Sequence, residues 1–346
     1  MSIVQLFDAK QAHRAGTGRL RGKRLLPRRR RKLVFERLEP RLLLSASPLS
    51  YTAATAANLT LKLVPDVNGS PTVALFDSSV NQGATPVVQQ ALAGTSGVDI
   101  RGSSQTDKLT IDESTGAFGP LPITYTGNGG QDSINVVGDG TTATSYAPNA
   151  ADSTGGTIVA GGSTLTFTGV TPVTDFNVSS FTFTGSPGND ALTLTSPGAG
   201  EVTIGGTVNG GAFETVTLAS FAANPSVTID TQGGNDSVTI GAGSGVSLPL
   251  SGGSLTIKGS QSLTVSSSGG ANLDTQGGDL NIVTSASDSG LLGNPSAQVT
   301  LNGALLSGGN VGISATSSWN PTDNSGIAGV SLIAGGSTAG VTIDGG

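Results

Sequence analysis

The sequence predicts an all-β protein built as a parallel β-helix, or β-solenoid, of short strands joined by glycine turns. Glycine accounts for 53 of the 346 residues, about twice its usual share. From residue 51 onward, pairs of apolar residues flank one residue that is mostly Thr, Ser or Asn, which is the period-two pattern of a half-buried strand. Helical periodicity is absent. The units include Leu109/Ile111, Ile134/Val136, Leu165/Phe167, Leu192/Leu194, Val227/Ile229, Val238/Ile240, Leu255/Ile257, Leu280/Ile282 and Val311/Ile313.

Internal repeats support this interpretation. Strand units recur at short intervals over much of the region, and Gly-Gly turns introduce several of them. The string DTQGG occurs twice, at residues 230–234 and 274–278. Self-similarity of this kind indicates stacked repeats. If one coil takes about 22 residues, the string returns after two coils.

Tandem β-sandwiches are the alternative architecture, in which similar strands pair as antiparallel hairpins. A sandwich is expected to bury aromatic anchors, whereas aromatic residues make up only 4% of this chain. A thin solenoid core of Val, Ile, Leu and Ala needs no such anchors, so the composition favours the solenoid. Residues 101–346 are assigned to solenoid repeats, and the less periodic residues 48–100 to a lead-in or cap. The last unit, Val341/Ile343, ends without a polar cap, which predicts truncation at the C-terminus.

Residues 1–32 form a basic arm, which is expected to be disordered because like charges repel and cannot pack a core. Residues 1–50 carry 13 Lys and Arg against 3 acids, while the rest of the chain carries 4 against 20. The two parts therefore have net charges of +10 and −16. The arm suits an anionic surface or the leader of an export signal. No aromatic residues interleave with its arginines, so nucleic-acid binding is not expected.

A short motif occupies residues 33–47, directly after the arm. Its fixed positions are Leu38, Glu39, Pro40, Arg41, Leu43 and Leu44. The apolar run at residues 42–44 is too short for an ordinary secretory signal or a membrane span, so no integral membrane segment is expected. The string resembles the LEPR-XLL motif, which is found near the N-termini of very large, repeat-rich bacterial surface or secreted proteins. This resemblance covers under a tenth of the chain and implies sorting or export, while the repeats are loosely similar to those of β-helical adhesins.

The composition argues against catalysis. The chain has no Cys, and its single His is His13 in the arm. Nucleophilic triads, Cys/His pairs and zinc centres therefore lack their parts. A β-helix polysaccharide-degrading enzyme is the less favoured alternative, because a glycosidase needs paired carboxylates and Glu201 and Glu214 stand alone. We expect no enzyme activity.

Calcium is the remaining candidate ligand. Asp132, Asp190 and Asp236 each end a polar turn and precede a strand unit, and Asp107 ends a poorer copy. These turns resemble degenerate copies of the RTX nonapeptide GGxGxDxUx. In that family the copies follow one another directly, whereas the turns here are unevenly and much more widely spaced. Tight-turn preference explains Asn, Asp and Gly at such positions equally well, so no cofactor is expected and calcium stays a weak candidate.

Together these features predict an exported protein, extracellular or on the cell surface, that serves as a structural stalk or an adhesive binding surface. The expected partners are export or sorting machinery, through the N-terminal motif, and a cell-surface or polysaccharide ligand. The alternative is a calcium-binding, RTX-like secreted repeat protein.

Overall fold

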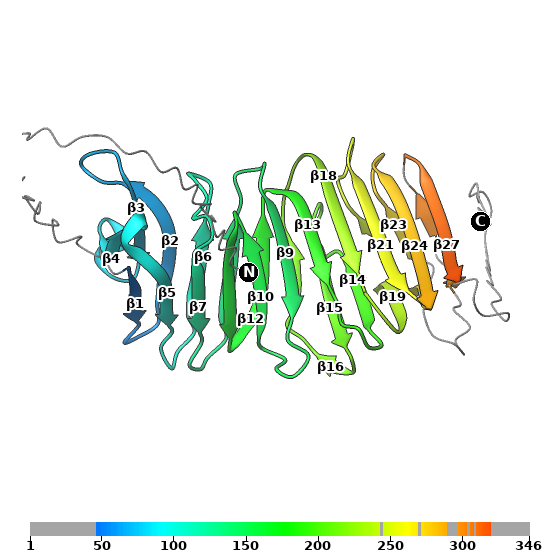
Figure 1. Ribbon diagram of the computed structural model, residues 1–346, viewed down its shortest axis with the longest axis horizontal. Coiled ribbons are helices and arrows are strands. Elements are labelled where there is room, and N and C mark those ends of the chain that lie inside the picture. Colours follow the sequence, from blue (N-terminus) through cyan, green and yellow to red (C-terminus); the bar gives the residue numbers. More distant parts are fainter. Residues whose placement is uncertain are drawn as a thin grey trace, which may run out of the picture. The chain divides into compact units, whose positions relative to one another are not determined.

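The computed structural model describes residues 46–242, 245–268, 271–288, 297–302, 305–307 and 309–319. The chain divides into two units, Met1–Leu43 and Leu44–Gly346, and every described residue belongs to the second. The described residues form 27 strands in three sheets, with two short 3-10 helices, η1 (Asn81–Gly83) and η2 (Leu92–Gly94) (Figure 1). The prediction of an all-β protein is confirmed.

Sheet A has 11 strands, most of which run parallel to their neighbours. In spatial order they are β1 (Ser47–Thr52), β5 (Thr95–Arg101), β7 (Pro122–Thr126), β11 (Ser163–Thr168), β10 (Gly156–Ala160), β9 (Ala143–Pro148), β13 (Val178–Thr184), β18 (Phe221–Asp230), β21 (Ser254–Ser260), β24 (Asp279–Asp288) and β27 (Val311–Trp319).

Sheet B has 13 strands and a similar arrangement. Its order is β25 (Gln298–Asn302), β22 (Ser262–Ser268), β19 (Asn235–Ala242), β14 (Ala191–Thr195), β15 (Val202–Val208), β17 (Val216–Leu218), β12 (Val170–Phe176), β8 (Asp132–Val137), β6 (Lys108–Asp112), β2 (Asn58–Pro65), β3 (Pro71–Asp77) and β4 (Pro86–Ala91), with β16 (Gly211–Ala212) paired to β15. A third, parallel sheet C contains β20 (Val246–Ser247), β23 (Asn272–Asp274) and β26 (Leu305–Ser307).

The chain passes repeatedly from sheet A to sheet B and back, and from β18 onward it also visits sheet C on each passage. Val98 lies opposite Ile123, and Val227 lies opposite Leu255. The steps between these partners are longer than the expected period of about 22 residues, so that expectation is wrong. The two DTQGG strings do not stack, because the first begins at the last residue of a sheet A strand, β18, and the second at the last residue of a sheet C strand, β23.

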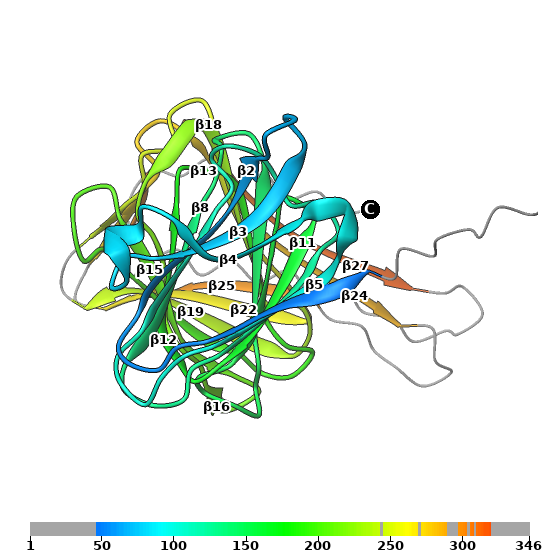
Figure 2. The same cartoon turned by 90° about the vertical axis from the view of Figure 1, so that its left-hand side faces the viewer.

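Antiparallel segments interrupt this parallel pattern in three places. β9, β10 and β11 form a meander in sheet A, and β14, β15 and β17 form another in sheet B. β2, β3 and β4 form the third at the β1 end of the sheets, where Gln90 on β4 donates to the Ser47 carbonyl at 3.1 Å (Figure 2). The segment 48–100 thus contains strands of the parallel ladders, β1, β2 and β5, together with this meander.

The core is built from the apolar residues of the alternating units, whose side chains alternate with outward Thr, Ser and Asn. Aromatic residues contribute more than the composition suggested: Tyr125, Tyr146, Phe167, Phe181 and Phe183 are among the largest fully buried side chains. They lie on β7, β9, β11 and β13, the strands around the sheet A meander. The expectation of a core built without aromatic anchors is wrong there, because these aromatic side chains fill part of the interior.

Candidate functional site

Four short polar turns of equal length lead into strands of sheet B, and each ends in a buried aspartate. They span residues 102–107, 127–132, 185–190 and 231–236 and lead into β6, β8, β14 and β19. The side chains of Asp107, Asp132, Asp190 and Asp236 are between 0% and 3% exposed. The period-two pattern already carried this signal, because the parity that buries Leu109 also buries Asp107.

Groups of the same turn and of neighbouring strands donate hydrogen bonds to these carboxylates. Asp107 accepts the Ala57 amide on one oxygen and the Ser103 amide on the other, both at 2.5 Å. Asp190 accepts the amide of Ser186 at 2.8 Å and its hydroxyl at 2.6 Å. An unpartnered buried carboxylate is costly, so these donors are what allows an acid to occupy a core position.

The four turns are stacked in two pairs. The Asp107 amide donates to Asp132 Oδ1 at 2.7 Å, and the Asp190 amide donates to Asp236 Oδ1 at 3.0 Å. The wide spacing within each pair therefore does bring turns side by side, contrary to the argument from the family's close spacing. One passage through the sheets separates the turns of the first pair, and the β15–β17 insertion lengthens the interval of the second. The two pairs are not stacked on each other, since Asp132 lies opposite Val170 on its other side.

Glycine begins three of the turns because the carboxylate occupies the space of a side chain. A Cβ on Gly127 would lie 2.3 Å from Asp132 Oδ2, and a Cβ on Gly185 would lie 2.1 Å from Asp190 Oδ2. The fourth turn begins with Thr231, whose hydroxyl donates to Asp236 Oδ2 at 2.6 Å. Thr231 thus donates a hydrogen bond to the carboxylate, whereas the glycines of the other turns leave space for it.

Burial raises the pKa of two of these carboxyls. The pKa of Asp132 is raised above its ordinary value, chiefly by desolvation, with a smaller contribution from the Asp107 charge. Desolvation also raises the pKa of Asp236 to about 6. Within the described residues, Asp132 Oδ2 and the Tyr125 hydroxyl have no hydrogen-bond partner.

Asp132, Asp190 and Asp236 lie in stacked acidic turns, as calcium ligands would, but they offer few free oxygens. Stacked acidic turns are what a bridged ion needs, and two pairs of turns are stacked. Calcium takes six to eight oxygens, however, and most oxygens of these carboxylates already accept hydrogen bonds. No group of three or more His, Cys, Asp or Glu that could hold a metal ion occurs among the described residues. The calcium site stays a prediction.

Two further acids, Asp175 and Glu214, are buried although their burial was not predicted from the sequence. Burial raises the pKa of Asp175 on β12 to about 7, although its carboxylate accepts the Thr144 hydroxyl at 2.5 Å. Burial likewise raises the pKa of Glu214 to about 7, and its carboxylate accepts the Tyr146 hydroxyl. The burial of Asp175 could have been predicted from the alternation along β12, because Asp175 comes two residues after the buried Val173 and lies opposite the buried Val136. Glu214 lies outside a strand, so no period could signal it.

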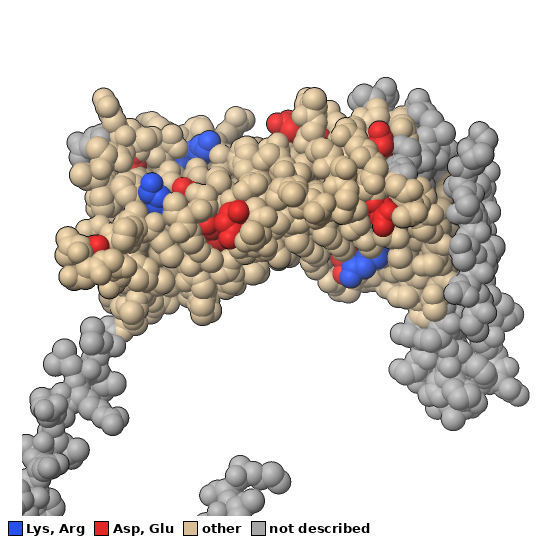
Figure 3. Space-filling model, turned by 90° about the horizontal axis from the view of Figure 1, so that it is seen from above, with Lys and Arg blue, Asp and Glu red and all other residues tan. Residues whose placement is uncertain are grey.

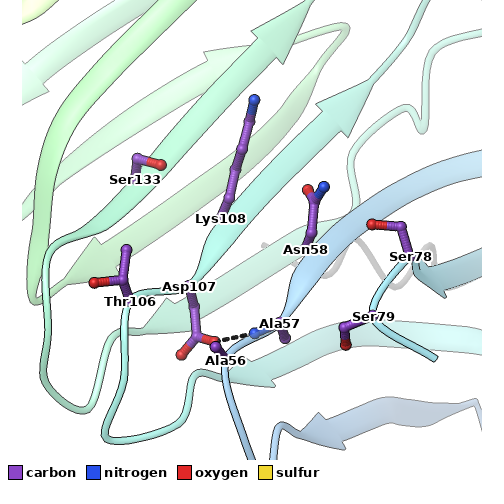
Figure 4. A pocket seen from close by; sticks show the side chains of 9 residues that line it. All are labelled: Ala56, Ala57, Asn58, Ser78, Ser79, Thr106, Asp107, Lys108 and Ser133. Atoms are coloured by element: carbon purple, nitrogen blue, oxygen red, sulfur yellow. Dashed lines mark hydrogen bonds between the residues drawn. The ribbon is translucent and has the colours of Figure 1, made fainter. Parts of the chain in front are cut away.

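An open hollow of about 480 Å³ lies beside the first aspartate turn (Figure 4). Asn58, Lys108 and Ser133 lie at the start of β2, β6 and β8 and stand in register across these strands. Ser78, which follows β3, closes the row, and its amide donates to the Asn58 carbonyl at 2.9 Å. Sequence reasoning missed this hollow because it depends on which strands are neighbours.

The targeting residues Leu38, Glu39, Pro40, Arg41, Leu43 and Leu44 lie outside the described residues, and so does the basic arm. Among the residues that are described, no helix has the length and apolar character needed to cross a membrane.

Comparison with known proteins gives no relative: no family model, curated protein or solved structure matches the chain.

Proposed function

We propose that this chain is an exported bacterial protein, secreted or held at the cell surface, whose second unit is a β-solenoid that acts as a stalk or adhesive surface without catalysis. The parallel, in-register stacking of strands is the observation that best supports the proposal. From β18 onward the same order of sheets A, B and C recurs, and each strand pairs with its counterpart of the next passage. Repetition of this kind builds long, stiff scaffolds from one supersecondary unit.

Many outward positions of the sheets carry threonines, which suit a rigid scaffold better than a catalytic site. Thr182, Thr228 and Thr256 stand opposite one another on β13, β18 and β21. On sheet B the hydroxyls of Thr203 and Thr217 are 2.8 Å apart. Cross-strand threonine pairs stabilise sheets. The face of the molecule seen in Figure 3 is mostly uncharged, with only scattered acidic and basic groups among the described residues.

Export is supported by the sequence of the first unit. The charge changes from +10 over residues 1–50 to −16 over the rest, and the string at residues 38–44 resembles the LEPR-XLL motif. A surface role accounts for both features: the basic leader would direct sorting, and the acidic unit would be the part that acts outside the cell.

The test is localisation of the full chain in a bacterium that carries proteins with this motif. Replacing Leu43→Asp and Leu44→Asp together is expected to leave most of the protein inside the cell, measured by fractionation and immunoblotting. The matched control replaces Leu291→Asp and Leu292→Asp, an equal apolar loss outside both the arm and the motif, and is expected to export normally. Intracellular wild-type protein, or normal export of the Leu43/Leu44 variant, would contradict the proposal.

A calcium-binding, RTX-like secreted protein is the second candidate, and the stacked pairs Asp107/Asp132 and Asp190/Asp236 are the observation in its favour. This candidate has the same proposed location. In it the aspartates would bind a calcium ion, whereas in the first proposal they accept hydrogen bonds from the amides of the turns.

A further inference from the structure

The hollow at the β1 end is lined by two kinds of polar side chain: those of Ser79, Thr106 and Asp107 are hydrogen-bonded within the described part of the protein, and four others are not. Within the described residues, no hydrogen bond involves the side chains of Asn58, Ser78, Lys108 or Ser133. All four residues line the same hollow (Figure 4). A ligand that enters it therefore meets an ammonium, an amide and two hydroxyls without displacing a protein partner.

Lys108 supplies the charge of this hollow. The other cations of the described residues have partners: Arg101 pairs with Asp99, Lys258 pairs with Asp230, and Lys62 lies 4.8 Å from the centre of the Phe76 ring. Lys108 makes no such contact within the described part of the chain. Asp107 also lines the hollow, but within the described residues it forms no ion pair with Lys108, and its buried carboxylate accepts the amides of Ala57 and Ser103.

The surroundings of the hollow suit an extended ligand. Thr60, Thr110 and Asn135 form the next outward row of the same strands, in register with one another. Lys62 follows Asn58 and Thr60 on the same face of β2, about 13 Å from Asn58 along the strand. The path thus runs from Lys108 past hydroxyl and amide groups to Lys62, which lies over the Phe76 ring and stands opposite Asp112 on β6.

We propose that this hollow and the adjoining face of β2, β6 and β8 bind an anionic polysaccharide, with Lys108 contacting its carboxylate or sulfate group. Charge-assisted hydrogen bonds from an ammonium recognise carboxylate and sulfate oxygens, and amide and hydroxyl groups pair with sugar hydroxyls. The inference deepens the proposed adhesive function, on which its biological use rests.

The test is calorimetric titration of the purified full chain with hexamannuronate, sulfated maltohexaose and neutral maltohexaose. The basic arm would attract any polyanion, so all variants carry Arg28→Gln, Arg29→Gln, Arg30→Gln and Arg31→Gln. We expect one of the anionic oligomers, carboxylated or sulfated, to bind at least tenfold more tightly than the neutral one. Which of the two binds identifies the anionic group.

Lys108→Ala is expected to weaken that binding about tenfold, the usual effect of losing one charge-assisted hydrogen bond. The matched control is Lys258→Ala, which removes a cation of sheet A and is expected to bind as the parent does. Because Lys108 is exposed, its variant should keep the parent's melting temperature. Equal affinities for the Lys108 and Lys258 variants, equal binding of the neutral oligomer, or no binding would overturn the inference. Lys108-dependent binding by a protein that stays inside the cell would instead overturn export alone.

Discussion

Replacing Gly185→Ala is expected to lower the free energy of unfolding by about 3 kcal/mol. The new Cβ would lie 2.1 Å from Asp190 Oδ2, so the carboxylate must move away. It would then lose the Ser186 amide and hydroxyl, which leaves the buried charge with the Asn209 amide as its remaining donor. Urea denaturation of the full chain, followed by circular dichroism, measures the change.

The control for this substitution is Gly94→Ala. A Cβ there would have only the flexible end of Gln90 within 4.0 Å, so the expected change is within about 0.5 kcal/mol. If Gly185→Ala were no more destabilising than Gly94→Ala, the role assigned to the aspartate turns would be wrong.

The protein is expected to be more stable at pH 5 than at pH 8. Burial raises the pKa of Asp175 to about 7 and that of Asp236 to about 6. A carboxyl whose folded pKa is raised stays protonated in the folded state while the unfolded chain ionises. Its destabilising effect therefore begins near the unfolded value, grows as pH rises, and is complete above about pH 7. Asp175 alone should cost about 4 kcal/mol by pH 8.

Asp175→Asn isolates this contribution, because the amide has the shape of the protonated acid and can still accept the Thr144 hydroxyl. The variant should unfold at higher urea concentration than the wild type at pH 8, and the two should converge toward pH 4. Asp139→Asn, at an exposed turn whose hydrogen bonds lower the pKa of that carboxyl, is the contrasting control and should show no gain at pH 8. A pH profile of Asp175→Asn parallel to that of the wild type would contradict the assignment.

The alternation of apolar residues predicted the strands well, because period two is a local property of the chain. Leu109/Ile111 and Ile134/Val136 lie on β6 and β8, facing the core as their pattern requires. Their pairing could not be predicted, since the interval between them depends on the lengths of the loops and of the intervening strand β7. The meanders were missed for the same reason: β10 and β11 carry the same pattern as parallel strands.

The positions of the turn aspartates could be predicted from the sequence, but their role could not. Asp132, Asp190 and Asp236 were singled out because each ends a turn before a strand. Their burial follows from strand parity, but the donors that make it tolerable come from backbone amides and hydroxyls of other residues, such as the Asp107 amide for Asp132. Backbone groups leave no composition signal, so a turn that binds calcium and a turn that binds its own carboxylate have the same sequence.

The stacking of strands along sheet A is the central claim, and spin-label distances test it directly. The chain has no cysteine, so pairs of introduced cysteines can be labelled without removing any. Thr124→Cys on β7 serves as the common site, paired in turn with Thr182→Cys on β13 and Thr256→Cys on β21. These strands lie four and six places from β7 in the sheet order.

At about 4.8 Å per strand, pulsed electron paramagnetic resonance should give Cα separations of about 20 Å for the first pair and about 30 Å for the second, apart from the length of the labels. The distance should thus grow in proportion to the number of strands crossed. A second distance equal to or shorter than the first would contradict the stacked arrangement and with it the proposed solenoid.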